Sequence, residues 1–217
     1  MRRTSVQESA TASRRAREQK RRELEILEAA ERVIALHGFH GAGMAEIARE
    51  AEYAVGTLYN LFESKEALYE RLLLERAKEF GAAMESALAG ASRTPRERLE
   101  AALATKADFF ARHLDFVRIY VSTSFVATTA HGLPPPALAI RDRLIDVVAG
   151  VFAEARERGE LRTEASATDL AVAFQALTQA FLIAAARDPD GFDPARVRAS
   201  VNDVLLDPVF AAGGGRP

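Results

Sequence analysis

Residues 38–68 read GFHGAGMAEIAREAEYAVGTLYNLFESKEAL, and this is the most informative stretch of the chain. Its apolar residues form two short runs, one around Ile47 and one around Leu58, whose three- and four-residue steps are typical of helices. The four residues 52–55 separate the two runs. Two short helices joined by so short a connection predict a helix-turn-helix at about residues 43–62.

Longer helices are expected on both sides of this motif. Upstream, apolar residues recur at helical spacing over residues 22–37, and Gly38 follows as a candidate helix end. Downstream, Ser64 is a good N-cap, because its hydroxyl accepts an otherwise unpaired N–H of the first helical turn. Together these elements predict one helical unit over residues 20–74.

The remaining two thirds of the chain also predict helices. Thr94-Pro95 marks a helix start, and Gly159 ends a long amphipathic segment. The clearest loop is residues 131–136, which contain three prolines. The sequence therefore predicts an all-α fold of about nine helices, with a second helical unit over residues 75–210 and a flexible tail over 211–217.

The N-terminal residues are polar and basic. Residues 1–22 carry eight Lys or Arg against two Glu and no apolar segment follows, so we expect no secretory signal. Residues 1–19 lack apolar periodicity, which predicts a disordered basic arm. Residues 170–186 are uncharged, but a membrane span needs about 20 apolar residues, so a buried or interface helix is predicted there. We therefore expect a cytoplasmic protein.

Composition and motifs exclude several kinds of active site. The chain has no cysteine, which removes disulfide scaffolds, thiol catalysis and cysteine-based zinc or iron–sulfur sites. Its four histidines are scattered, so no metal site is predicted. A net charge of −2 argues against a protein that is basic throughout. No nucleophile elbow, P-loop, dinucleotide fingerprint or zinc-protease motif occurs, so we expect neither an enzyme nor a cofactor.

The identities within the helix-turn-helix region point to one family. A glycine–aromatic pair follows the first helix, and an Ile-Ala pair lies in the second helix. Short runs typical of one family stand at the start of the third and fourth helices. The residues are Gly38-Phe39, Ile47-Ala48, Gly56-Thr57-Leu58-Tyr59 and Phe62-Glu63-Ser64-Lys65-Glu66. In this combination, residues 20–74 resemble the DNA-binding domain of TetR-family transcriptional regulators (TetR/AcrR type).

The resemblance implies that the third helix of this domain enters the DNA major groove. Leu58, Leu61 and Phe62 form its apolar face, and the other face carries small and polar residues. An Asn amide pairs with adenine and a Thr methyl meets a thymine methyl, whereas hydroxyls also bind phosphates. The N–H groups at the start of the second helix and the lysine that opens the fourth are implied to hold phosphates. The predicted DNA-binding residues are Gly43, Met44, Ala45, Ala54, Val55, Gly56, Thr57, Tyr59, Asn60 and Lys65.

Four residues depart from the family pattern. Gly43 stands where Thr or Ser is common, Val55 where Lys, Arg or Pro is common, and Asn60 where His is frequent. Glu52 occupies a turn position that often carries Gly, and a positive φ is strained for any other residue, so the turn is expected to differ slightly from the family's. These departures reduce the expected number of contacts to the DNA backbone. The arginines of residues 14–22 either follow DNA phosphates or form a solvated tail, and both interpretations stay open.

The resemblance also implies that residues 75–210 form an effector-binding and dimerisation domain. No cluster of acids or bases accompanies its aromatic residues, so the expected effector is a small, mostly apolar molecule. The pocket candidates are Phe109, Phe110, His113, Phe116, Tyr120, Ser124, Phe125, Leu144, Val148 and Phe174. The apolar stripe of the helix near residue 175 predicts dimer contacts at Leu170, Phe174, Leu177, Phe181 and Ala185.

The predicted function is therefore ligand-responsive regulation of transcription. A homodimer places two recognition helices about one DNA turn apart, which suits a palindromic operator in double-stranded DNA. Repression is favoured over activation, because occupying a promoter requires no further surface. The alternative is an all-helical ligand-binding or interaction protein in which the departures at Gly43, Glu52 and Val55 have weakened DNA recognition.

Overall fold

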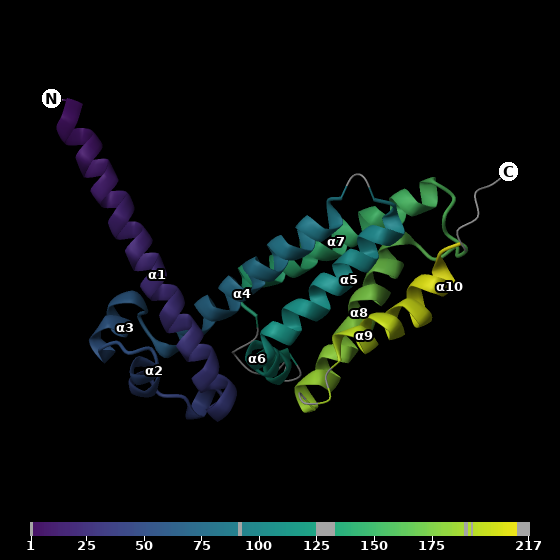
Figure 1. Cartoon of the computed structure of the whole chain (residues 1–217). Coiled ribbons are helices and arrows are strands. Elements are labelled where there is room, and N and C mark those ends of the chain that lie inside the picture. The colour runs from purple at the N-terminus through teal and green to yellow at the C-terminus, as the bar shows by residue number, and fades with distance from the viewer. Residues whose placement is uncertain (1, 91–92, 125–132, 189–190, 192, 212–217) are drawn as a thin grey trace. The chain divides into compact units, whose positions relative to one another are not determined.

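A computed structural model describes the backbone of residues 2–90, 93–124, 133–188, 191 and 193–211 (Figure 1). It describes side chains from Arg14 onward in these ranges, except at residues 120–124, 182, 185 and 186. Within this part of the chain all regular elements are helical, and one isolated antiparallel bridge joins Leu161 to Phe210. The predicted all-α class is confirmed. None of the described helices is both long and apolar enough to cross a membrane.

The chain divides into two compact units, residues 1–72 and 73–217. The first unit contains α1 (Arg2–Gly41), α2 (Met44–Glu50), α3 (Val55–Leu61) and the beginning of α4 (Lys65–Leu88). Helix α1 contacts α2, and α2 contacts α3. The buried apolar residues of this unit include Ile26, Leu27, Ala30, Val33, Ile34, Met44, Ile47, Leu58, Phe62, Leu68 and Leu72. The predicted helix-turn-helix is therefore formed by α2 and α3.

Helix α1 begins at Arg2, so the segment expected to be a disordered arm over residues 1–19 is helical from that residue. The first glycine of the chain is Gly38, so neither glycine nor proline interrupts the segment. Arg21 pairs with Glu18 and with Glu25, each at 2.7 Å, and such pairs one turn apart support an exposed helix. Residues 14–17 and 19 are exposed, and an exposed stretch of helix does not need an apolar stripe.

Glycine and capping residues end and start the helices where the sequence predicts. Gly38 has φ 70° and ψ 166° within α1, which interrupts helical geometry at the predicted place. The Ser64 hydroxyl accepts the Ala67 N–H at 3.1 Å at the start of α4. Thr94 and Glu97 form a capping box before α5, and Gly159, with φ 69°, follows α7.

The second unit is a helical bundle around one apolar core. It contains the rest of α4, α5 (Pro95–Arg112), α6 (Leu114–Ser124), α7 (Pro135–Glu157), α8 (Ala167–Arg187) and a C-terminal segment. That segment runs without a break through α9 (Pro194–Val201), the π-helical turn η1 (Asn202–Leu206) and α10 (Asp207–Val209). Counted with this segment, the described residues form nine helical segments, the predicted number.

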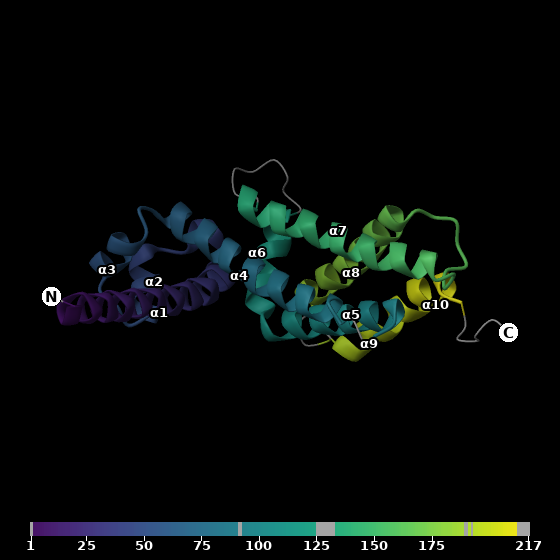
Figure 2. The same cartoon turned by 90° about the horizontal axis from the view of Figure 1, so that it is seen from above.

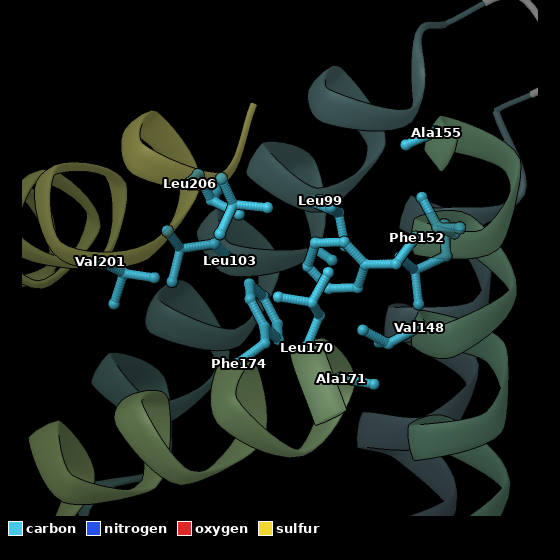
Figure 3. Packing of buried hydrophobic residues seen from close by; sticks show 14 of the residues in the cluster. Leu99, Leu103, Val148, Phe152, Ala155, Leu170, Ala171, Phe174, Val201 and Leu206 are labelled. Carbon is cyan, nitrogen blue, oxygen red and sulfur yellow. The ribbon is translucent and has the colours of Figure 1, made fainter. Parts of the chain in front are cut away.

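The core of the second unit lies where α5, α7, α8 and the C-terminal segment meet. Helices α7 and α8 lie against each other, as do α5 and α9 (Figure 2). Buried leucines and phenylalanines from all of them interdigitate (Figure 3). Figure 3 labels Leu99, Leu103, Val148, Phe152, Ala155, Leu170, Ala171, Phe174, Val201 and Leu206.

The turn between α2 and α3 contains backbone strain at Glu52. Glu52 has φ 60°, a left-handed conformation that L-residues other than glycine adopt at a cost. Its neighbour Ala51 has an ordinary φ of −82°. Substituting Glu52→Gly should therefore raise the free energy of unfolding by about 0.5–1 kcal/mol. Ala51→Gly is the matched control and should lower it, because glycine there only adds freedom to the unfolded chain. Chemical denaturation measures both, and a lowered stability in Glu52→Gly contradicts the strain.

Candidate DNA-binding surface and effector pocket

Helix α3 has one buried face and one exposed face. Leu58 is completely buried and Phe62, at its C-cap, is 5% exposed. On the opposite side, Tyr59 is 54% exposed and Val55 is 38% exposed, while Asn60 is exposed and Thr57 is half-buried. The core role predicted for Leu58 and Phe62 is confirmed. The polar groups predicted to contact DNA accordingly lie on a surface open to a partner.

The starts of α2 and α3 are built from small residues. A Cβ added to Gly43 or Gly56 would meet no atom within 4 Å, so another molecule's backbone can approach both positions closely. Ala45 and Ala54 are also exposed. The Met44 side chain is only 8% exposed and belongs to the core. Only its backbone N–H, one of the unpaired donors of the first helical turn, remains a candidate for a phosphate contact.

Two polar contacts attach the strained turn to α1. The Tyr53 hydroxyl donates to Glu25 Oε2 at 2.5 Å, and Arg32 Nε lies 2.7 Å from Glu50 Oε1. The hydrogen bond to Glu25 raises the pKa of Tyr53. Because Tyr53 follows Glu52 directly, this bond holds the turn in the conformation that sets the direction of α3.

Lys65 has a structural role that the sequence did not reveal. Its Nζ donates to the Phe39 carbonyl at 2.8 Å and to the Ala42 carbonyl at 3.1 Å. It also lies 4.5 Å from the centre of the Phe39 ring. The ammonium therefore binds the carbonyl end of α1, where the helix dipole is negative. These contacts use two of its three N–H donors, so the predicted phosphate contact has one donor left.

A groove runs between the basic part of α1 and α3. Its lining includes Arg14, Arg15 and Arg22 from α1 and Thr57 and Asn60 from α3. Glu18 also lines it and pairs with Arg21 and Arg22. Because helix continues through residues 14–22, these arginines lie beside the predicted recognition helix rather than on a separate tail.

The second unit contains an apolar cavity with room for a few water molecules, about 60 Å³. Helices α4 to α8 all contribute to its wall. The apolar wall consists of Ala77, Phe80, Phe110, Phe116, Leu133, Ala137, Ile140 and Leu144. The polar wall consists of Arg76, Lys106, Arg141, Gln175 and Gln179.

Lys106 is the unusual member of this wall. Its side chain is 2% exposed, and its Nζ donates to Gln175 Oε1 at 3.0 Å and to Thr178 Oγ1 at 2.6 Å. Burial lowers its pKa to about 7, because a charged amine is poorly solvated there. The prediction that no cluster of bases lies in this region is wrong. Three cations far apart in the sequence converge here only in the folded unit.

Three of the predicted pocket residues line the cavity: Phe110, Phe116 and Leu144. Phe109, Val148 and Phe174 instead fill the core, each less than 5% exposed. His113 packs on the Phe109 ring at 4.4 Å and lies 3.3 Å from Glu79. The side chains of Tyr120 and Ser124, and all of Phe125, lie outside the described residues. Helical spacing identified apolar faces correctly but did not separate core from cavity.

The fold also places the predicted dimer contacts in different environments. Leu170 and Phe174 are buried in the unit's own core, at 5% and 1% exposure, and are not free to meet a partner. Leu177 and Phe181 are half-buried against the same core, and the Ala185 side chain lies outside the described residues. The exposed side of α8 carries small apolar residues instead. They are Val172, Ala173, Ala176, Ala180 and Ala184.

The first unit is a helix-turn-helix and the second is a helical bundle, which is the architecture that the sequence predicts. Residues 26–72, within the first unit, match the family model described as bacterial regulatory proteins, tetR family. The match covers α2, α3 and the adjoining parts of α1 and α4. No curated protein matches the sequence.

Solved structures of regulators share the fold at low sequence identity. The transcriptional regulator FadR from Bacillus subtilis, in complex with stearoyl-CoA, is 20% identical with a TM-score of 0.73; the match covers 85% of this chain and 98% of that one. AibR, in complex with isovaleryl coenzyme A and operator DNA, is 23% identical with a TM-score of 0.67, covering 87% and 100%. The ketosteroid regulator KstR2 of Mycobacterium tuberculosis is 21% identical with a TM-score of 0.67, covering 88% and 96%.

The contacts of Lys65 predict a loss of stability when the ammonium is removed. Lys65→Met should lower the free energy of unfolding by about 1–3 kcal/mol, because two carbonyls lose a charged donor. The matched control is Lys78→Met on the same helix, where the lysine is exposed and pairs with Glu75 one turn away, and it should change stability by less than about 0.5 kcal/mol. Urea denaturation of both variants measures the difference. Equal stabilities would contradict the role of Lys65 at the end of α1.

Proposed function

We propose that this regulator is a dimeric repressor whose α3 helices bind a palindromic operator. A small, mostly apolar effector binds in the cavity of the second unit and releases the repressor from the operator. The observation that carries the proposal is the exposed face of α3, where Thr57, Tyr59 and Asn60 surround a surface with no side chain at Gly56. A helix of this kind fits the major groove and offers groups for both bases and phosphates.

We propose that the groove beside α3 extends the DNA-binding surface. Arg14, Arg15 and Arg22 add positive charge next to Thr57 and Asn60, and arginines hold phosphates without reading sequence. Such contacts compensate for the phosphate-binding side chains missing at Gly43 and Val55. They favour the regulator over the alternative of an interaction protein with weakened DNA recognition.

The proposed effector is small because the cavity is small. Phe80, Phe110 and Phe116 provide an apolar wall, and the volume of about 60 Å³ admits a short apolar group without rearrangement. Similar folds bind acyl thioesters in the structures of FadR with stearoyl-CoA and of AibR with isovaleryl coenzyme A. No catalytic step is part of this proposal.

The proposed dimer contact is the exposed side of α8. Val172, Ala176 and Ala180 are spaced four residues apart and therefore lie on one face, and Val172 is 50% exposed. Small side chains allow two helices to approach closely. This face replaces the buried contacts at Leu170 and Phe174 that the sequence predicted.

Selection of bound duplexes from a random-sequence DNA pool tests the operator proposal. The purified chain should enrich a palindrome. Tyr59→Ala should bind the selected duplex at least about tenfold more weakly, because a contact worth about 1–3 kcal/mol is removed. Its thermal stability should stay unchanged, since the side chain is mostly exposed. Tyr59→Phe separates the hydroxyl from the ring. No enrichment by protein that has been refolded free of ligand favours the alternative function.

A charge on the exposed side of α8 tests the dimer proposal. Ala176→Arg should shift the protein to monomers in sedimentation velocity and weaken operator binding about a hundredfold, because the half-sites lose their linkage. Ala82→Arg is the matched control, an exposed alanine on α4 outside the proposed contact, and should remain dimeric. A dimer that survives Ala176→Arg contradicts this choice of face.

A further inference from the structure

The charges around the cavity have one sign. Three cationic side chains contribute to its wall, Arg76, Lys106 and Arg141, and no Asp or Glu does among the described residues. Arg76 pairs with Glu79 and Arg141 with Asp142, each at 2.8 Å, so both guanidinium groups have acidic partners beside the cavity. Lys106 differs from both in its burial and in its partners.

Lys106 has neutral acceptors only. Its Nζ binds the side-chain oxygens of Gln175 and Thr178, and no carboxylate among the described residues lies within 4.0 Å of it. Thr178 in turn donates to the Phe174 carbonyl at 2.8 Å, so its hydroxyl is oriented to accept from the lysine. The two acceptors use two of the three ammonium N–H groups, which leaves one donor for a molecule in the cavity.

An isolated buried charge is costly, and a pairing anion removes that cost. The lowered pKa of Lys106 expresses the same cost, since burial disfavours the charged amine. An acid entering the cavity supplies the missing charge, and the apolar wall binds the rest of the molecule. The neighbouring Gln175 amide carries N–H donors suited to the second oxygen of a carboxylate.

We propose that the effector is an unesterified carboxylic acid with a short apolar chain, and that its carboxylate pairs with Lys106 while Phe80, Phe110 and Phe116 enclose the chain. This inference rests on the proposed function, because it names the effector class of the same cavity. The proposed site distinguishes a free acid from its thioester. An acyl thioester places a neutral carbonyl where the acid has its carboxylate, and so leaves Lys106 without a counter-charge.

Calorimetry tests the proposal by measuring the affinity of each probe for the full-length, refolded protein. The probes are hexanoate, hexanamide, 1-hexanol and hexanoyl-CoA, which share a chain and differ in the group that meets Lys106. Hexanoate should bind at least about tenfold more tightly than hexanamide or hexanol. Butanoate and octanoate show how chain length is accommodated in the cavity.

Lys106→Met is the decisive variant, because methionine is also unbranched and keeps the cavity wall apolar. The substitution removes a buried charge, so the variant should be at least as stable as the wild type. A failure to fold therefore does not confuse the result. Hexanoate affinity should fall at least about tenfold, while hexanol affinity should change little. Lys78→Met, an exposed change of the same kind, should bind all probes as the wild type does.

Separate measurement of operator release distinguishes this inference from the proposed function. Hexanoate binding that depends on Lys106 supports the carboxylate site. If hexanoate binds in this way but does not release the operator, the proposed release mechanism is overturned and the carboxylate site is still supported. If hexanol or hexanoyl-CoA releases the operator and hexanoate does not, the proposed regulatory function is supported and the proposed carboxylate site is overturned. Equal affinities for hexanoate and hexanamide, tight hexanoate binding by Lys106→Met, or no binding of any of the three carboxylates also overturns it.

Discussion

The first unit, which contains the helix-turn-helix, depends on the burial of one face of α3. A helix of seven residues is too short to be stable alone, so α3 exists because Leu58 and Phe62 are held in the core of the unit. Once these side chains are fixed, the helical repeat places Tyr59 and Asn60 on the opposite, exposed side. The recognition surface is therefore a consequence of core packing. Polar contacts outside α3, including the bond from Tyr53 to Glu25, then fix the turn that sets its direction.

A second constraint governs the cavity of the other unit. Aromatic and aliphatic side chains from several helices leave a small apolar space, and the packing of α5 against α8 puts the Lys106 amine into its wall. An apolar cavity alone selects poorly among small hydrophobic molecules. Among the described residues the Lys106 amine has neutral acceptors, Gln175 and Thr178. A buried charge with neutral partners is costly, and in our proposal the same packing that imposes this cost makes the site selective for an anion.

The predicted faces of the helices were largely correct, and the errors concern what each face contacts. Helical periodicity shows that Leu170 and Phe174 are apolar, but a core, a cavity and a dimer contact all require apolar residues. The fold assigns both to the core of their own unit. The basic segment before residue 20 was predicted to lack structure for a related reason. Its helix is mostly exposed over residues 14–19, where an apolar period is not needed, and the absence of glycine and proline allows the helix to continue.

The amino-acid sequence was sufficient to predict the helical class, the position of the helix-turn-helix and the helix ends marked by Gly38, Ser64 and Thr94. All of these depend on interactions within a few residues, namely periodicity, capping and backbone conformation. The packing of the helices was needed to show which residues line the cavity, that Lys65 binds the end of α1, and that Lys106 is buried beside Gln175 and Thr178. Lys106 and Thr178 are 72 residues apart in the chain. A contact between them depends on how whole helices pack, and no local pattern encodes that.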